Sequence, residues 1–125
     1  MFWNKYFWPS FLVMILVVGL HWFALLNDIY DTVQWYDIVM HFLGGLWVFL
    51  FVLWAIHTQY GRFFLKHASI RNLIFFVLVV GVLWEILEIV LGFMHFSDPG
   101  YGFDVFKDLV IDILGAICGS IFYKK

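Results

Sequence analysis

The chain is short of charged residues, and positively charged residues are the rarer kind. Its 125 residues include seven lysines and arginines against nine aspartates and glutamates, a net charge of −2. A nucleic-acid-binding surface needs Lys and Arg clustered on one face, so the composition predicts no nucleic-acid partner. Cysteine is nearly absent as well. The chain has one cysteine, Cys118, which lies in an apolar segment. Because a disulfide needs two cysteines, an internal disulfide is excluded.

Apolar residues, by contrast, make up 65% of the chain, and the mean hydropathy is +0.96. Soluble domains are roughly half apolar, and a membrane-spanning helix needs about 17 to 25 predominantly apolar residues. Four segments meet this requirement: residues 9–26, 35–56, 71–93 and 105–123. We therefore predict an all-α integral membrane bundle of four transmembrane helices, formed by residues 1–125 as a single transmembrane domain.

The positively charged residues predict how this bundle is oriented. Six of the seven fall on one side of the predicted spans: Lys5, Arg62, Lys66, Arg71, Lys124 and Lys125. Lys107 falls on the other side. Because Lys and Arg in short loops favour the cytoplasmic side, we expect both termini to be cytoplasmic in a multi-pass protein of the cell membrane. The lipid bilayer is then the first expected partner.

A stripe of polar residues and small apolar residues recurs on three of the predicted helices. Residues three or four apart lie on one helix face, and each stripe follows steps of four, three and four. The stripes are Asp37, His41, Gly44 and Val48; Gly81, Glu85, Glu88 and Gly92; and Asp108, Asp112, Gly115 and Gly119. Each of these apolar helices is therefore predicted to present one polar face.

The predicted topology brings the ionisable side chains to one depth. At a rise of about 1.5 Å per residue, four of them lie roughly 7 to 12 Å below the outer boundary. These four are His41, Glu85, Glu88 and Asp112. Asp37 and Asp108 lie about one turn higher. An ionised carboxylate at membrane depth costs at least about 2.5 kcal/mol, so protons or a bound cation must offset these charges.

The types of side chain in this layer narrow the choice of cation. Carboxylates with one imidazole suit Mg²⁺, Mn²⁺ or Ca²⁺, and Zn²⁺ or Fe can bind through the imidazole. We predict a divalent cation with four protein ligands: His41, Glu85, Glu88 and Asp112. Asp37 or Asp108, nearer the surface, is predicted to act as a catalytic general base. The Glu-x-x-His signature of di-iron bundles is absent. A layer that holds only protons and a purely structural polar network stay open alternatives.

Glycines on the same helices let backbones approach closely. A GxxxG motif at residues 115–119 is accompanied by Gly44, Gly45, Gly81 and Gly92. We expect these glycines to pack helices together, and glycine-rich faces can also join copies of the chain in a homo-oligomer. His21, in the outer half of the first span, is a weaker candidate for the site, and a packing or hydrogen-bonding role is favoured for it.

Three motifs together resemble a known family. They are Asp37-x3-His41-Phe42, Trp84-Glu85-x2-Glu88 and Asp108-x3-Asp112-x2-Gly115-x3-Gly119. In these motifs the chain is similar to the VanZ-like small polytopic membrane proteins, and especially to the YjdF-type bacterial inner-membrane family. Ile38 stands where VanZ proteins usually carry a basic residue, which favours the YjdF type. The resemblance covers the second to fourth spans and implies a role in the cell envelope, without supplying a reaction.

Three functions fit these observations, in decreasing order of preference. The first is a metal-dependent enzyme whose cation activates water or polarises a phosphoryl or acyl oxygen of a lipid-linked substrate. Against it, no serine, cysteine or lysine is placed as a nucleophile, and no arginine lies near the layer to bind phosphate. The second is a non-enzymatic envelope or partner-binding protein with a structural polar cluster. The third, a proton- or cation-coupled transporter, is disfavoured by apolar inner halves such as residues 50–56 and 73–80.

Overall fold

The computed structural model describes residues 2–123, and these residues form helices and no strand. The long helices are α1 (Phe7–Leu26), α3 (Tyr36–Ile56), α4 (Ile70–Val90) and α5 (Tyr101–Gly119). Shorter elements are α2 (Ile29–Thr32) and the 3-10 helices η1 (Arg62–His67) and η2 (Ser120–Phe122). The predicted all-α fold is confirmed. Lys124 and Lys125, used above to predict orientation, lie outside the described residues.

Three of the long helices, α1, α3 and α4, are long and apolar enough to cross a membrane. The chain is therefore a multi-pass membrane protein. The fourth long helix, α5, has 19 residues, about 28 Å at the usual rise. It is the most polar of the four, because it carries Asp104, Lys107, Asp108 and Asp112.

The ends of the helices follow the turn residues closely. Pro9 lies in the first turn of α1, where its missing N–H costs nothing. Helix α4 ends at Val90, three residues before the predicted end of the third span, and Gly92 follows in the left-handed region with φ 79°. Helix α5 begins at Tyr101 rather than near residue 105. Gly100 is its N-cap with φ 74°, so Asp104, the residue just before the predicted span, lies inside the first turn.

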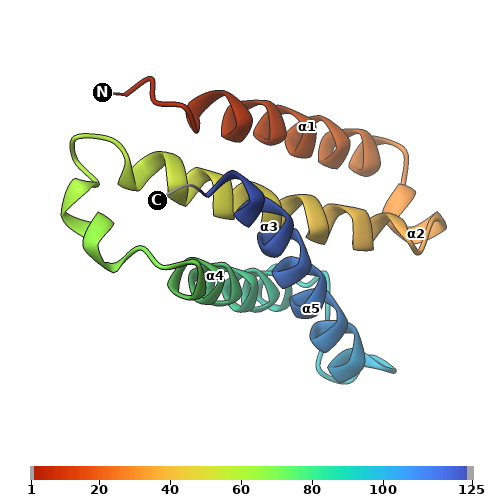
Figure 1. The fold of residues 1–125 in the computed structure, drawn as a ribbon. Coiled ribbons are helices and arrows are strands. Elements are labelled where there is room, and N and C mark those ends of the chain that lie inside the picture. Colours follow the sequence, from red (N-terminus) through yellow and green to blue (C-terminus); the bar gives the residue numbers. More distant parts are fainter. Residues whose placement is uncertain (1, 124–125) are drawn as a thin grey trace.

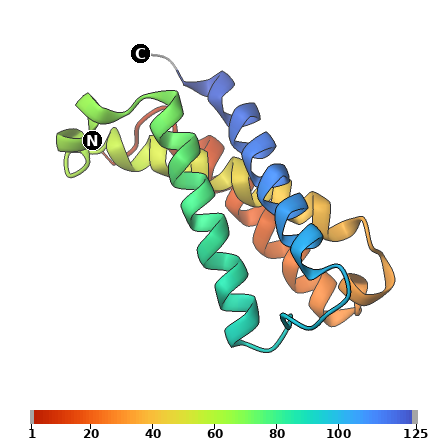
Figure 2. The same ribbon diagram turned by 90° about the horizontal axis from the view of Figure 1, so that it is seen from below.

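The long helices run antiparallel to one another in chain order, and α3 contacts the other three (Figures 1 and 2). Two hydrogen bonds fix one end of the bundle. Asn4 Nδ2 donates to the Trp54 carbonyl at 3.0 Å, and the Tyr123 hydroxyl donates to the Ala68 carbonyl. The start of α1, the connection from α3 to α4, and the end of α5 therefore lie together, with α2 and the α4–α5 loop at the opposite end.

The apolar core lies in the half of the bundle near these hydrogen bonds. The largest fully buried side chains are Phe49, Leu50, Leu53 and Val77. On the outside of the bundle, large apolar side chains are exposed, such as Leu12 at 61%. An apolar surface of this extent is suited to lipid tails rather than water. The fully buried apolar side chains of α3 lie in its second half, whereas His41 lies in the first half and makes polar contacts.

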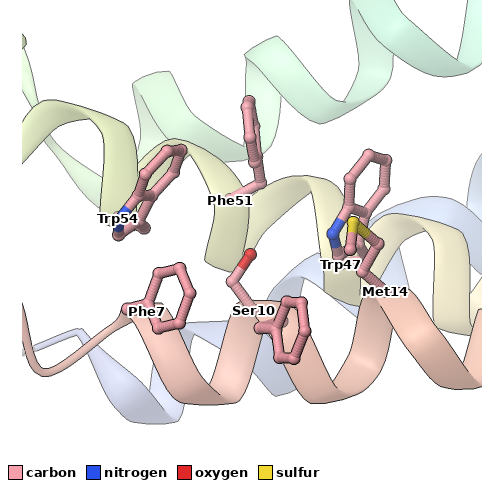
Figure 3. Close-up of a pocket in the computed structure, with 7 residues that line it drawn as sticks. Phe7, Ser10, Met14, Trp47, Phe51 and Trp54 are labelled. Atoms are coloured by element: carbon pink, nitrogen blue, oxygen red, sulfur yellow. The ribbon is translucent and has the colours of Figure 1, made fainter. Parts of the chain in front are cut away.

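Helix α1 packs on α3 around a cavity of about 140 Å³. Figure 3 shows Phe7 and Ser10 of α1 facing Phe51 and Trp54 of α3 across this space. The indole N–H of Trp47, which also lines it, is buried and has no hydrogen-bond partner among the described residues. Helix α1 therefore contacts α3 through side chains around a cavity, whereas α3 and α5 are in contact through their backbones.

Glycines bring α3 and α5 into close contact. A Cβ on Gly45 would overlap the backbone oxygen of Asp112, and a Cβ on Gly115 would overlap the backbone oxygen of Phe42. The predicted packing role is confirmed for Gly45 and Gly115, because only a residue without a side chain fits at either position. It is wrong for Gly44 and Gly92, where a Cβ would meet no atom of the described residues within 4 Å. The surfaces of Gly45 and Gly115 are covered by the same chain. A homo-oligomer joined through glycine-rich faces stays a prediction and would have to use other surfaces.

Candidate metal centre

His41 lies in the second turn of α3 and points toward α5 with only 7% of its side chain exposed. Its Nδ1 lies 3.0 Å from Oδ1 of Asp112 on α5. An ionised Asp112 can only accept, so Nδ1 carries the proton and donates it to that carboxylate. The close approach of α3 and α5 at Gly45 makes this contact possible. The other ring nitrogen, Nε2, is thereby left free to face the remaining acidic side chains.

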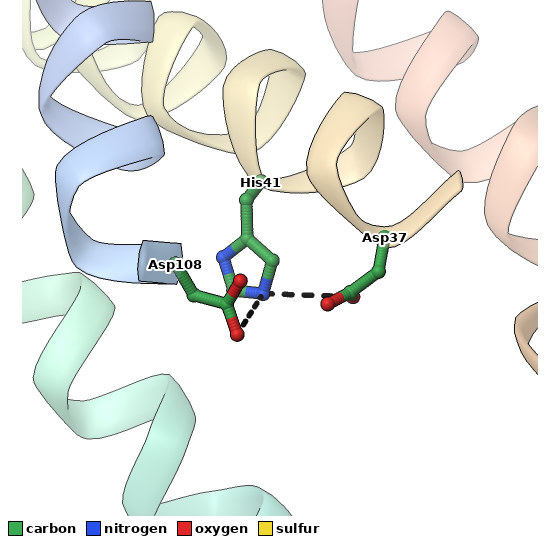
Figure 4. Close-up of side chains that lie close together, drawn as sticks. All are labelled: Asp37, His41 and Asp108. Atoms are coloured by element: carbon green, nitrogen blue, oxygen red, sulfur yellow. Dashed lines mark ion pairs between the residues drawn. The ribbon is translucent and has the colours of Figure 1, made fainter. Parts of the chain in front are cut away.

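Three carboxylates surround Nε2 of His41. Asp37 Oδ1 lies 3.6 Å from it, Asp108 Oδ2 3.7 Å and Glu85 Oε1 4.0 Å. These distances are too long for hydrogen bonds. Figure 4 shows Asp37 and Asp108 converging on the ring from α3 and α5. One ligand atom each from Asp37, His41 and Asp108 lies within 4.8 Å of the other two.

This spacing suits a metal ion. Ligand atoms bound about 2.0–2.2 Å from one cation lie roughly 3.0–3.5 Å from one another. The observed separations from Nε2, 3.6–4.0 Å, are longer than this, so the side chains would have to move inward on binding an ion. The buried group of Asp37, His41 and Asp108 can therefore hold a metal ion.

The burial of the acidic side chains adds a demand for positive charge. Glu85 is 4% exposed, and neither of its carboxylate oxygens has a hydrogen-bond partner among the described residues. Asp108, 2% exposed, likewise has Oδ1 without a hydrogen bond. A buried carboxylate without a partner is strongly destabilising unless it is neutralised or binds a cation. The cluster is therefore incomplete as a set of side chains alone.

Lys107 supplies part of the missing charge. Its Nζ lies 3.4 Å from Asp108 Oδ1 and 3.6 Å from Asp104 Oδ1, and 28% of its side chain is exposed. The sequence already predicted Lys107 on the side of the bundle that carries the acidic layer, and the structure places it in contact with Asp108 of that layer. Its ammonium group contacts one of the four carboxylates of the cluster, so protons or another cation must offset the negative charge of the rest.

Comparison with known proteins bears on the identity of the chain. Residues 3–125 match the family described as Predicted membrane protein (DUF2238). The chain belongs to this family. Neither a curated protein nor a solved structure matches it. The resemblance to the VanZ-like and YjdF-type families is therefore wrong. Its motifs were short, and acid-plus-glycine spacing arises in any membrane bundle that packs polar helix faces through glycines.

The structure of this DUF2238 chain brings five of the six predicted site residues into one set of ion pairs around His41 and leaves the sixth, Glu88, outside that set. His41 is surrounded by the other four: Asp37, Glu85, Asp108 and Asp112. Glu88 instead accepts a hydrogen bond from Trp84 Nε1 at 3.0 Å, one turn back on α4. No ion pair joins Glu88 to another described residue. The individual roles of the six as ligands or as a general base stay predictions.

Tyr30, on α2, is a neighbour of the site that sequence reasoning missed. Its hydroxyl lies 2.8 Å from Nδ1 of His21. Burial, with the negative charge of Asp37 as a smaller contribution, raises the pKa of Tyr30 to about 12. The hydroxyl therefore stays protonated at neutral pH and can donate to His21, which gives His21 of the DUF2238 chain the hydrogen-bonding role favoured above. Tyr30 lies in the short segment between the first two predicted spans, residues 27–34, where no periodic pattern of residues indicated a role for it.

Proposed function

We propose that this protein binds a divalent cation within the membrane through Nε2 of His41 and the carboxylates of Asp37, Asp108 and Glu85. The observation that carries the proposal is the ring of three carboxylate oxygens 3.6–4.0 Å from one imidazole nitrogen. Asp112 acts through the opposite ring nitrogen. A carboxylate on the second nitrogen of a metal-bound histidine fixes its tautomer and orientation, which is the arrangement of Asp112 and His41.

A protonated imidazole explains the same geometry less well. An imidazolium Nε2–H would draw one carboxylate to a charge-assisted hydrogen-bond distance of about 2.7–2.9 Å. Instead, three oxygens lie at similar and longer distances from Nε2. One imidazole with several carboxylates is compatible with Mg²⁺, Mn²⁺, Ca²⁺ or Zn²⁺, and we keep all four as candidates.

We further propose that the bound cation serves a hydrolytic reaction on a lipid-linked substrate of the cell envelope. Two features support this. The Asp37 side chain is 38% exposed, whereas His41 and Asp108 are buried, so the site is reachable from the side of Asp37. Lys107 stands beside Asp108 and offers an ammonium group to an anionic substrate. A cation at an open site polarises a phosphoryl or acyl oxygen and activates water.

A second candidate function is structural: the bound cation stabilises the fold and takes part in no reaction. The observation in its favour is that the site ties α3 to α5 where glycine contacts already bring them together. Transport finds less support. The half of the bundle beyond the site is filled by fully buried apolar side chains such as Phe49 and Leu53, and a conducted ion would find no polar group there.

The hydrolytic proposal is tested with purified protein in mild detergent, incubated with a panel of phospholipids and isoprenoid phosphates and followed by mass spectrometry. We expect one lipid class to be converted, conversion to fall to background after chelation, and activity to return when a divalent cation is added. The cation is required because no side chain is placed as an alternative nucleophile. Metal retention without conversion of any lipid in the panel would reject the enzyme and leave the structural role.

The positively charged residues support an orientation with both termini in the cytoplasm and the metal centre in the outer half of the membrane. We test this in a Cys118→Ala background with single cysteines at exposed positions. His95→Cys, in the α4–α5 loop, should react in intact cells with a membrane-impermeant thiol reagent. Lys66→Cys, in η1, should react only after lysis. The reverse labelling pattern would overturn the orientation.

A further inference from the structure

A second cavity lies at the opposite end of the bundle from the metal centre. It has a volume of about 450 Å³ and is bounded by the end of α3, by η1 and by the start of α4. Its walls are mainly apolar, with Phe51, Phe64 and Phe76 among them, and the polar side chains of His67 and Asn72 lie at one edge. Cavities of this size and composition are typical of small-molecule sites.

The walls of this cavity are held in place by hydrogen bonds across separate elements. Asn72 Nδ2 donates to the carbonyl of His67 at 2.7 Å, which ties α4 to η1. The Tyr123 hydroxyl donates to the carbonyl of Ala68, which ties the same connection to the end of the chain's last helix. Ser69 caps α4 by accepting from the N–H of Asn72. The cavity is therefore part of the folded bundle.

The segment that bounds the mouth of the cavity, from the end of α3 to the start of α4, carries basic residues and no acidic ones. Arg62 and Lys66 lie on η1, and Arg71 lies in the first turn of α4, all of them exposed. No aspartate or glutamate occurs between residues 38 and 84. The N-terminus of α4 adds partial positive charge at the same place. An anion at this mouth would meet several positive charges and no compensating negative one.

The same segment carries exposed aromatic side chains. Phe63 is 71% exposed and Phe64 59% exposed, and the ammonium of Lys66 lies 5.0 Å from the centre of the Phe63 ring. Exposed aromatic residues beside basic ones are typical of segments that lie at the boundary between lipid tails and headgroups. A ligand at this position therefore has an apolar part in the membrane and an anionic part at its surface.

We propose that this cavity binds one anionic phospholipid. An acyl chain lies among Phe51, Phe64 and Phe76, and the phosphate lies against Arg62, Lys66 and Arg71. Charge complementarity selects the anionic headgroup, and the apolar walls select a lipid over free phosphate, which would leave the cavity unfilled. The inference is independent of the metal centre, because no residue of the cavity belongs to the acidic cluster.

The test uses the full chain in nonionic detergent, with phosphatidylglycerol and phosphatidylcholine as probes and native mass spectrometry to count retained lipid. We expect the parent to retain phosphatidylglycerol at least about fivefold over phosphatidylcholine, because only the first presents a net negative charge to the basic mouth. Two variants separate the contributions. Arg62→Gln, Lys66→Gln and Arg71→Gln together remove the charge, and Ala55→Phe fills the cavity from α3.

Both variants should lose the preference, whereas Lys5→Gln, a basic residue that precedes α1 and lies on neither η1 nor α4, should keep it. Bound metal should be unchanged in all of them, which separates this test from that of the proposed function. If Ala55→Phe lowers the melting temperature, Val52→Phe on the same wall takes its place. No preference in the parent, or a preference that survives filling of the cavity, would overturn the proposal.

Discussion

Replacing His41 with glutamine is expected to reduce bound metal from near one equivalent per chain to less than about a tenth. The imidazole is the one nitrogen ligand in the cluster, and its Nε2 is the point on which three carboxylates converge. Glutamine has a similar volume, but its neutral amide is a weaker metal ligand than the imidazole nitrogen. Loss of a metal-histidine ligand removes more affinity than the 10- to 100-fold typical of its hydrogen-bonding partners. Elemental analysis of the purified protein measures the outcome.

The matched control is His95→Gln, which changes a histidine of the α4–α5 loop whose side chain is 65% exposed. It should leave the metal content unchanged. A second comparison uses α4. Glu85→Gln should lower the metal content because Glu85 faces His41, and Glu88→Gln should not, because Glu88 bonds to Trp84. Absence of metal from both the parent and His41→Gln would show that the cluster is balanced by protons, and near-stoichiometric metal in both would mean that the ion does not depend on His41.

The sequence was sufficient to predict the helices and most of the side chains that the structure brings together around His41. Long apolar runs bounded by turn residues predicted α1, α3 and α4 closely, and the four-residue spacing of Asp37 and His41 on one helix predicted that they share a face. Depth in the membrane then predicted that α5 contributes to the same layer. Three-dimensional packing agrees, because Asp112 meets His41 across the contact between α3 and α5.

The sequence could not distinguish Glu85 from Glu88. They lie three residues apart on α4, so both are near one face, and a rotation of the helix by a fraction of a turn decides which one faces His41. That rotation is determined by contacts such as the one between Gly81 and the side chain of Asp112. Trp84 Nε1 then donates a hydrogen bond to the carboxylate of Glu88, which forms no ion pair with His41. The start of α5 was misjudged for a similar reason, since a left-handed Gly100 caps the helix before Asp104 can.

The second prediction concerns two neighbouring glycines in α3. Gly45→Ala should lower the free energy of unfolding by about 2–3 kcal/mol, because the added methyl group overlaps the backbone oxygen of Asp112 and forces α5 away. Gly44→Ala adds the same methyl group one residue earlier, where no other atom lies within 4 Å. It should be neutral or stabilise by up to about 1 kcal/mol, as alanine is the better helix former. Thermal unfolding in detergent compares the two.

The same pair of variants links the fold to the site. When α5 moves away from Gly45, Asp112 moves with it, and the hydrogen bond that orients the imidazole of His41 lengthens. We therefore expect Gly45→Ala to weaken metal binding by at least about tenfold, even at temperatures where the protein remains folded, and Gly44→Ala to keep the affinity of the parent. Equal metal affinity in both variants would mean that the close contact of α3 and α5 stabilises the bundle without positioning Asp112 on His41.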